Sequence, residues 1–218
     1  MKRLCWFLVL FAHTFCFSQR DWSKVEITSQ KLADNIYVLF GAGGNIGLAI
    51  GDESAYIIDD QFGPLTKKIL SHIKTLTEKP VKWVLNTHWH GDHTGGNENM
   101  ANQGAIIIAH ENVRKRMATK LGSAQSKSSV SLKEPALPVV TFNDKMTLHL
   151  DNGNTMYGMH VNDAHTDGDS YYYFPEDNVL HMGDNFFVGR YPYIDLNSGG
   201  DIDGLISNVT MVLGIIDN

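Results

Sequence analysis

The sequence predicts an α+β domain, and three patterns carry that prediction. Short runs of β-branched and aromatic residues, separated by turn residues, fill residues 25–58 as in an antiparallel meander. Beyond them, amphipathic helical patterns alternate with short apolar runs, which is typical of helices packed on a sheet. Apolar residues make up 43% of the 218-residue chain and charged residues 19%, the balance of a folded rather than a disordered chain.

The N-terminus has the pattern of a secretory signal. A short basic start precedes an apolar run, Leu4–Phe17, and polar residues follow at once. This run is shorter than the roughly 20 apolar residues that span a bilayer. We therefore expect a cleaved signal at residues 1–18, one domain over residues 19–218 in the periplasm or outside the cell, and no stable membrane anchor.

The cysteine content points the same way. Both cysteines, Cys5 and Cys16, lie within the predicted signal. A lipoprotein cut before Cys16 is the weaker alternative, because the bulky Phe15 stands where a small residue is expected. Without these two residues the mature domain forms no disulfide and has no thiolate for metal binding or nucleophilic catalysis.

The first elements are strands, followed by a helix. The strand-like runs lie at residues 25–27, 36–40, 46–50 and 56–58. The glycine-rich segment 41–45 joins the second and third of them, and we expect it to be a flap at a hairpin tip. Apolar residues then recur on one face of residues 64–76, with a proline near the first turn, which predicts an amphipathic helix.

The remaining elements alternate between strands and helices. Buried strands are predicted at residues 82–86 and 105–109, a helix at 111–121, a surface segment at 123–138, strands at 145–150, 155–161, 170–174 and 178–182, and a last helix at 203–216. The strands are short apolar or alternating runs, the surface segment is rich in Ser, Lys and Pro, and the last helix carries an apolar stripe.

The residues that suggest chemistry cluster directly after the strand predicted at 82–86. Three imidazoles and a carboxylate lie within six residues, at His88, His90, Asp92 and His93. A loop held at a strand end is rigid, as a metal site requires, and neutral imidazole and carboxylate suit zinc as well as iron or manganese. On a turning loop the first two histidines can face one position and the last two residues a second. Two adjacent metals or a single one remain possible.

This motif resembles the signature of the metallo-β-lactamase superfamily, His-x-His-x-Asp-His, here followed by Thr94-Gly95-Gly96. Residues 57–59, 164–169 and 181–184 resemble three further motifs of that family, in the same order. The resemblance covers nearly all of the chain after the signal. It implies a four-layer αβ/βα sandwich with the metals at one edge, between the two sheets.

The resemblance also implies six metal ligands and Zn²⁺ as the cofactor, one or two per chain. They are His88, His90 and His165 for one metal, and Asp92, His93 and Asp184 for the second, with Asp184 bridging or completing it. The family's last histidine usually lies in a Gly-His-Gly motif after the final helix, and no histidine follows His181. We therefore expect the sandwich to be C-terminally truncated, without its last strand and helix, and the second metal to bind weakly.

The implied reaction is metal-assisted hydrolysis of a small-molecule carbonyl compound. A metal-activated hydroxide attacks an amide, ester or lactam carbonyl, and Asp92 orients the nucleophile and relays a proton. A secreted enzyme of this family is commonly a β-lactamase. Asp184 stands where one lactamase group has cysteine, and Phe187 where it has a substrate-binding lysine, which favours a thioesterase or lactonase as the alternative. A catalytically impaired metal-binding fragment is another.

Charge and the remaining polar residues complete the sequence expectations. A net charge of −6, together with the signal, disfavours a nucleic-acid partner. Asp59 is either a turn residue or the acceptor that fixes a ligating imidazole, and Asp60 is expected to face solvent or to lie in a turn. We expect His110, at the start of a helix, and His160 to be structural. Arg190 either binds a substrate carboxylate or is a surface charge.

Overall fold

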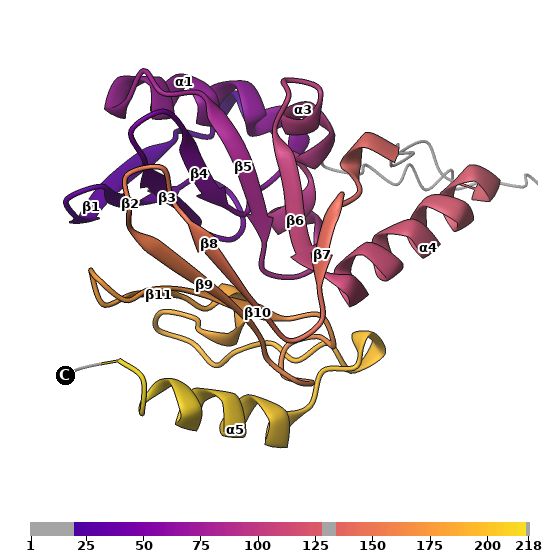
Figure 1. The fold of residues 1–218 in the computed structure, drawn as a ribbon. Coiled ribbons are helices and arrows are strands. Elements are labelled where there is room, and N and C mark those ends of the chain that lie inside the picture. Colours follow the sequence, from indigo (N-terminus) through magenta and orange to yellow (C-terminus); the bar gives the residue numbers. More distant parts are fainter. Residues whose placement is uncertain (1–19, 128–133, 217–218) are drawn as a thin grey trace, which may run out of the picture.

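The computed structural model describes residues 20–127 and 134–216, in which two β-sheets face each other with helices outside them (Figure 1). The predicted signal and residues 128–133 of the predicted surface segment lie outside this description. The larger sheet runs in the order β1 (Thr28–Ala33), β2 (Ile36–Phe40), β3 (Ile46–Ile50), β4 (Ala55–Ile58), β5 (Val81–Asn86), β6 (Ile106–His110) and β7 (Val140–Phe142). The smaller sheet runs β11 (Val179–His181), β10 (Ser170–Phe174), β9 (Thr155–His160) and β8 (Lys145–His149).

The larger sheet changes character at β4, and this change positions the site. Strands β1 to β4 form the predicted antiparallel meander, whereas β4, β5, β6 and β7 pair in parallel. Helix α1 (Thr66–Leu76) connects β4 to β5, and α4 (Glu111–Lys127) follows β6. Parallel strands need such crossovers, so the carboxyl ends of β4 and β5 meet at one edge of the sheet.

Three apolar cores separate four layers. Ile57 of β4 joins the core beneath α1, whereas its neighbour Ile58 joins the core between the sheets, which also contains Tyr172 of β10. The next residue back along β10, Tyr171, faces away from that core and packs with Val212 of α5 (Ile202–Val212). Successive residues of a strand therefore pack into cores on opposite faces of its sheet, and the predicted αβ/βα sandwich is confirmed.

The strand predicted at residues 25–27 is wrong. A short 3-10 helix, Trp22–Lys24, is followed by irregular chain, and β1 begins only at Thr28. The ammonium group of Lys68, on α1, donates hydrogen bonds to three backbone carbonyls of this segment, those of Trp22, Ser23 and Val25. Within the predicted strand, the carbonyl of Val25 is therefore bound by a lysine of the neighbouring helix and not by a strand partner.

The short helix that the sequence indicates after Thr94-Gly95-Gly96 is α3 (Asn97–Ala101), whereas two other short elements, α2 (Gly91–Thr94) and β7, have no counterpart in the sequence prediction. Each is at most five residues long, too short to show a period.

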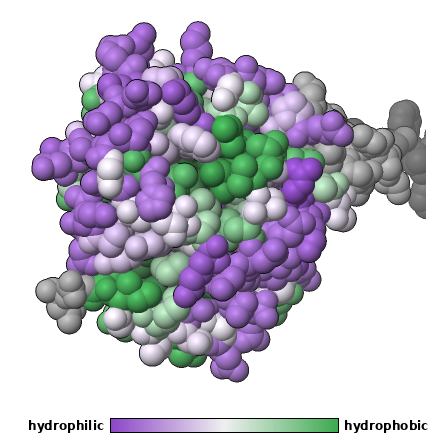
Figure 2. Space-filling view, in the orientation of Figure 1, coloured by the Kyte–Doolittle hydropathy of each residue, from purple (hydrophilic) through white to green (hydrophobic). Residues whose placement is uncertain are grey.

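Figure 2 shows a largely hydrophilic face with apolar groups between the polar ones, including at the lower edge where α5 runs. Over residues 20–127 and 134–216, no helix is long and apolar enough to cross a membrane.

Candidate metal centre

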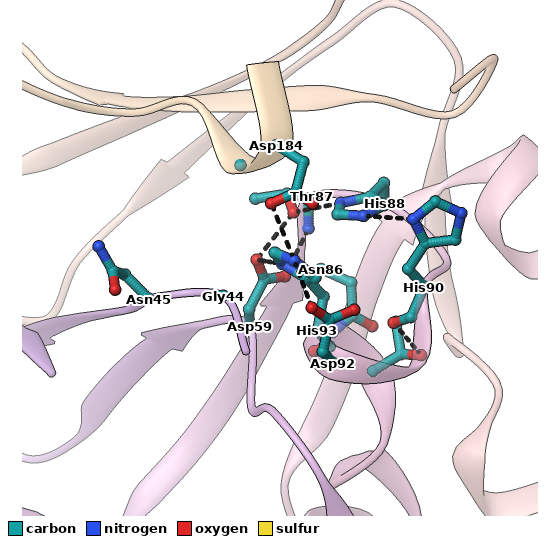
Figure 3. Close-up of polar contacts among 12 residues, drawn as sticks. Gly44, Asn45, Asp59, Asn86, Thr87, His88, His90, Asp92, His93 and Asp184 are labelled. Atoms are coloured by element: carbon teal, nitrogen blue, oxygen red, sulfur yellow. Dashed lines mark hydrogen bonds and ion pairs between the residues drawn. The ribbon is translucent and has the colours of Figure 1, made fainter. Parts of the chain in front are cut away.

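Three parts of the chain meet at the edge where β4 and β5 end. The loop after β5 carries His88 and His90, and its last turn is α2. The loop after β9 carries His165, and the 3-10 helix after β11 carries Asp184. Figure 3 shows Asp184 reaching down from the ribbon of the second half of the chain toward the histidines of the first. The two sheets together therefore build one site.

Three imidazole nitrogens converge in the first ligand group, which consists of His88, His90 and His165. His90 Nδ1 lies 3.1 Å from His88 Nε2 and 2.9 Å from His165 Nε2. His88 and His165 are buried, and His90 is partly buried. The structure thus brings together, around one point, the three residues that the sequence assigned to one metal.

The outer nitrogen of each of these rings donates to a protein oxygen. The pairs are His88 Nδ1 to Thr87 Oγ1 at 3.0 Å, His90 Nε2 to Asp195 Oδ2 at 2.9 Å, and His165 Nδ1 to the Tyr193 carbonyl at 2.7 Å. The Thr87 hydroxyl proton is already donated to Asp59 Oδ2, at 2.7 Å. The outer bonds therefore fix each neutral ring so that its inner nitrogen carries a lone pair. Three lone pairs that face one point without a proton between them fit a metal cation.

The second ligand group consists of Asp92, His93 and Asp184. His93 Nε2 lies 3.1 Å from Asp184 Oδ1 and 3.8 Å from Asp92 Oδ2. This nitrogen is buried and has no hydrogen-bond partner. The other oxygen of Asp184 lies 3.6 Å from His165 Nε2, so this carboxylate stands between the two groups. The ligand atoms of the first group together with Asp184 lie close enough to one another to hold a metal ion. The same is true of the three residues of the second group.

The sequence left two interpretations of Asp59, and the structure decides between them. Its carboxylate is buried, and Oδ2 accepts from His93 Nδ1 at 2.7 Å while Oδ1 accepts from the Thr87 backbone N–H at 2.8 Å. Asp59 thus orients the ring of His93, with Nε2 toward Asp184. The backbone φ of +63° at Asp59 is left-handed, a conformation that aspartate adopts more often than most residues other than glycine.

The expectation that Asp60 faces solvent is wrong. The residue is buried, its backbone N–H donates to the His93 carbonyl at 2.9 Å, and its Oδ1 accepts from the Gly96 N–H at 2.8 Å. Burial raises the pKa of its carboxyl well above the ordinary value. Asp60 therefore bonds to the backbone of α2 at His93 and to the chain just after it at Gly96.

The two groups differ in charge. Burial, reinforced by the neighbouring imidazoles, lowers the pKa of His88 well below its ordinary value, so this ring stays neutral. Burial also acts to lower the pKa of His93, but the carboxylates of Asp59 and Asp184 outweigh it and raise that pKa well above the ordinary value. A proton and a metal cation therefore compete for the Nε2 of His93.

The other histidines that the sequence singled out lie outside these groups. His110 ends β6 instead of starting a helix, and its ring stacks on that of His160 with the centroids 3.6 Å apart. His181 donates from Nε2 to the Asn45 carbonyl at 3.2 Å. The Arg190 guanidinium lies over the ring of Phe187, 4.8 Å from its centroid.

Sequence reasoning missed Asp195, Tyr193 and Thr87, which hold the three rings of the first group. Asp195 is 105 residues from His90 in the chain and sits at the start of a short 3-10 helix, Leu196–Ser198. Its other contacts, with the Ser198 hydroxyl at 2.6 Å and the Asn197 N–H at 3.1 Å, are those of an ordinary capping aspartate. The sequence around Asp195 indicates only this capping role, so it contains no signal of the contact with His90.

Comparisons with known proteins agree with this architecture. The solved structure of a metallo-beta-lactamase from Pontibacter korlensis has a TM-score of 0.65, with 21% identity over 85% of this chain and 86% of its own. The metallo-beta-lactamase IND-7 has a TM-score of 0.69, with 15% identity over 86% and 84%, and DIM-1 one of 0.68, with 16% identity over 88% and 87%. At these identities the likeness shows the fold alone. The family model described as "Metallo-beta-lactamase superfamily" matches residues 40–214, and the chain belongs to that superfamily.

Proposed function

We propose that this protein is a secreted, zinc-dependent hydrolase that acts on a small-molecule amide, ester or lactam in the manner of a β-lactamase. The observation that carries this proposal is the pair of adjacent ligand groups that share Asp184. Solved structures of the same fold are described as metallo-beta-lactamases. The predicted signal at residues 1–18 supports export from the cytoplasm.

Zinc held by these groups would polarise a carbonyl oxygen and lower the pKa of a water molecule to about 7. The residues of the chain supply orientation and proton transfer. Asp92 is the most exposed carboxylate of the two groups, with 36% of its side chain accessible against 20% for Asp184. It is therefore suited to orient the attacking oxygen and to pass its proton to the leaving group. No cysteine, serine or threonine nucleophile is required.

A thioesterase or lactonase of the same fold is the second candidate. The carboxylate of Asp184, where one lactamase group has a cysteine, favours it. In either case Arg190, stacked on Phe187 and close in the chain to Asp184, is the proposed partner of a substrate carboxylate.

The test combines metal analysis of the full chain with hydrolysis of three substrates: nitrocefin, a thioester and an aryl lactone. Nitrocefin turnover by the unchanged protein that is lost in His90→Ala supports the β-lactamase proposal. Turnover of only the thioester or the lactone supports the second candidate function instead. Bound zinc with no turnover of any of the three overturns the hydrolase proposal in favour of an impaired metal-binding protein, and the absence of zinc binding overturns the metal centre itself.

A further inference from the structure

Gln61 is a buried polar side chain that the proposed chemistry does not use. It follows Asp59 and Asp60 directly, and its side chain is fully buried. Its backbone has a φ of +54°, a left-handed conformation that is uncommon for residues other than glycine, asparagine and aspartate. A buried amide in a constrained backbone persists where the surrounding structure specifies it, so its partners indicate what it does.

Both ends of the Gln61 amide bind the glycine loop, residues 41–45, between β2 and β3. Oε1 accepts from the Ala42 N–H at 3.1 Å, and Nε2 donates to the Gly44 carbonyl at 2.6 Å. The sequence predicted a flap at this hairpin tip. The two bonds join this loop, through one side chain, to the segment that follows β4.

The fastened loop lies directly on the second ligand group. A Cβ atom on Gly44 would stand 2.1 Å from Cε1 and 2.6 Å from Nε2 of His93, and one on Gly43 would stand 2.6 Å from Cβ of Asp92. The loop backbone is therefore in contact with both side chains, at a distance that only glycine permits. Figure 3 shows Gly44 and Asn45 on the ribbon that passes beside Asp59 and His93.

The first ligand group has other supports. Thr87, Tyr193 and Asp195 accept from its three rings, and Gln61 bonds to none of them. Gln61 thus bonds only to the loop beside the second group, although the Thr87 hydroxyl links the two groups through Asp59. A change at Gln61 reaches His93 and Asp92 through the glycine loop, whereas the outer bonds of His88, His90 and His165 remain.

We propose that Gln61 is a positioning residue for the second ligand group: it holds the glycine loop against His93 and Asp92 and thereby sets the metal affinity of that group alone. The proposal rests on the proposed function only for metal binding, and it requires no particular reaction. A protein that binds two metals and hydrolyses nothing would refute the hydrolase proposal and leave this one standing.

The test is Gln61→Met, which keeps the length of the side chain and removes both hydrogen bonds. Gln103→Met is the matched control, because Gln103 is exposed and its amide donates only to the nearby Asn99 carbonyl at 3.2 Å. Zinc affinities of both sites are measured by chelator competition, Co²⁺ absorption spectra report the ligand geometry, and hydrogen exchange reports the Ala42 amide.

We expect the weaker zinc site of Gln61→Met to lose about 10–100-fold in affinity, the range for residues that orient a metal ligand, while the stronger site stays within about twofold. The Ala42 amide should exchange faster, and the control should match the unchanged protein in every measurement. Equal weakening of both sites would overturn the proposal, and so would two unchanged affinities.

A second variant covers the case in which Gln61→Met does not fold. Gly44→Ala leaves Gln61 in place and puts a methyl group against the ring of His93. It should also weaken one site selectively and alter only part of the Co²⁺ spectrum. If Gly44→Ala keeps both zinc affinities, the loop does not position His93 and the proposal is wrong.

Discussion

The two ligand groups of the metal centre are supported in opposite ways. The first is three imidazole rings, each with its own oxygen acceptor, and two of those acceptors come from the loop at residues 193–195 in the second half of the chain. The second consists of Asp92, His93 and Asp184; Asp59 orients the ring of His93, and the glycine loop of the first half lies against His93 and Asp92. The first group therefore depends on how the two sheets pack, whereas the second depends mainly on the loops beside β4.

The largest effect should come from Asp184, the one residue that both groups share. Asp184→Ala removes the oxygens that lie 3.1 Å from His93 and 3.6 Å from His165. We expect zinc affinity to fall at both sites by more than about 100-fold, the upper end for residues that only orient a ligand. Chelator competition measures both affinities. Loss at one site alone would show that Asp184 belongs to that group only.

His90→Ala should separate the groups. It removes one of three converging nitrogens, so the stronger zinc site should lose more than about 100-fold in affinity, while the weaker site changes only a few-fold. Native mass spectrometry would then count one zinc where the unchanged protein holds two at saturation. His149→Ala, at an exposed position of β8, is the control. Unchanged stoichiometry in His90→Ala would contradict the assignment of the first group.

Asp195→Asn tests the support of the first group rather than its ligands. The variant replaces the charged acceptor of His90 Nε2 by a neutral one, and about a 10–100-fold loss of affinity at the first site is expected. The second site should not change. Asp34→Asn is the control, because Asp34 is fully exposed and its ion pair with Lys31 is worth little. A loss in both variants would show a general charge effect.

The smallest effect concerns the stacked pair behind the His165 loop. Burial, then the adjacent His160, lowers the pKa of His110 to about 4, whereas an unfolded histidine has about 6.5. The unfolded state therefore takes up a proton first, and stability falls as the pH drops from 6.5 toward 4. Between pH 7 and pH 5, His110→Phe should lose about 1–2 kcal/mol less free energy of unfolding than the unchanged protein. This difference corresponds to a few degrees in Tm of the metal-free protein. Parallel Tm curves for the two proteins would contradict it.

The sequence predicted the strands and ligands that short stretches of the chain specify by themselves. The runs at 36–40, 46–50 and 170–174 match β2, β3 and β10, because alternating apolar residues report strands without reference to the rest of the chain. The six proposed ligands also lie in short motifs, and the structure brings them together.

What the sequence did not show depends on contacts between distant segments. Asp195 resembles a helix cap, and Gln61 resembles a polar residue after a strand, although one bonds to His90 and the other to the glycine loop. The prediction of a strand at residues 25–27 failed for the same reason, because Lys68, on a helix more than forty residues away, binds the carbonyl of Val25 and those of Trp22 and Ser23 before it. Such partners are set by packing and not by local preference.

The hydroxyl of Thr87 connects the two groups by hydrogen bonds. It accepts a hydrogen bond from His88 Nδ1 and donates one to Asp59, which in turn accepts one from His93. Hydrogen bonds in such a buried series polarise one another, so a positive charge drawn to one end is felt at the other. Each metal is therefore expected to change the affinity of the other by no more than about twofold, and thermodynamic reciprocity requires that factor to be the same in both directions.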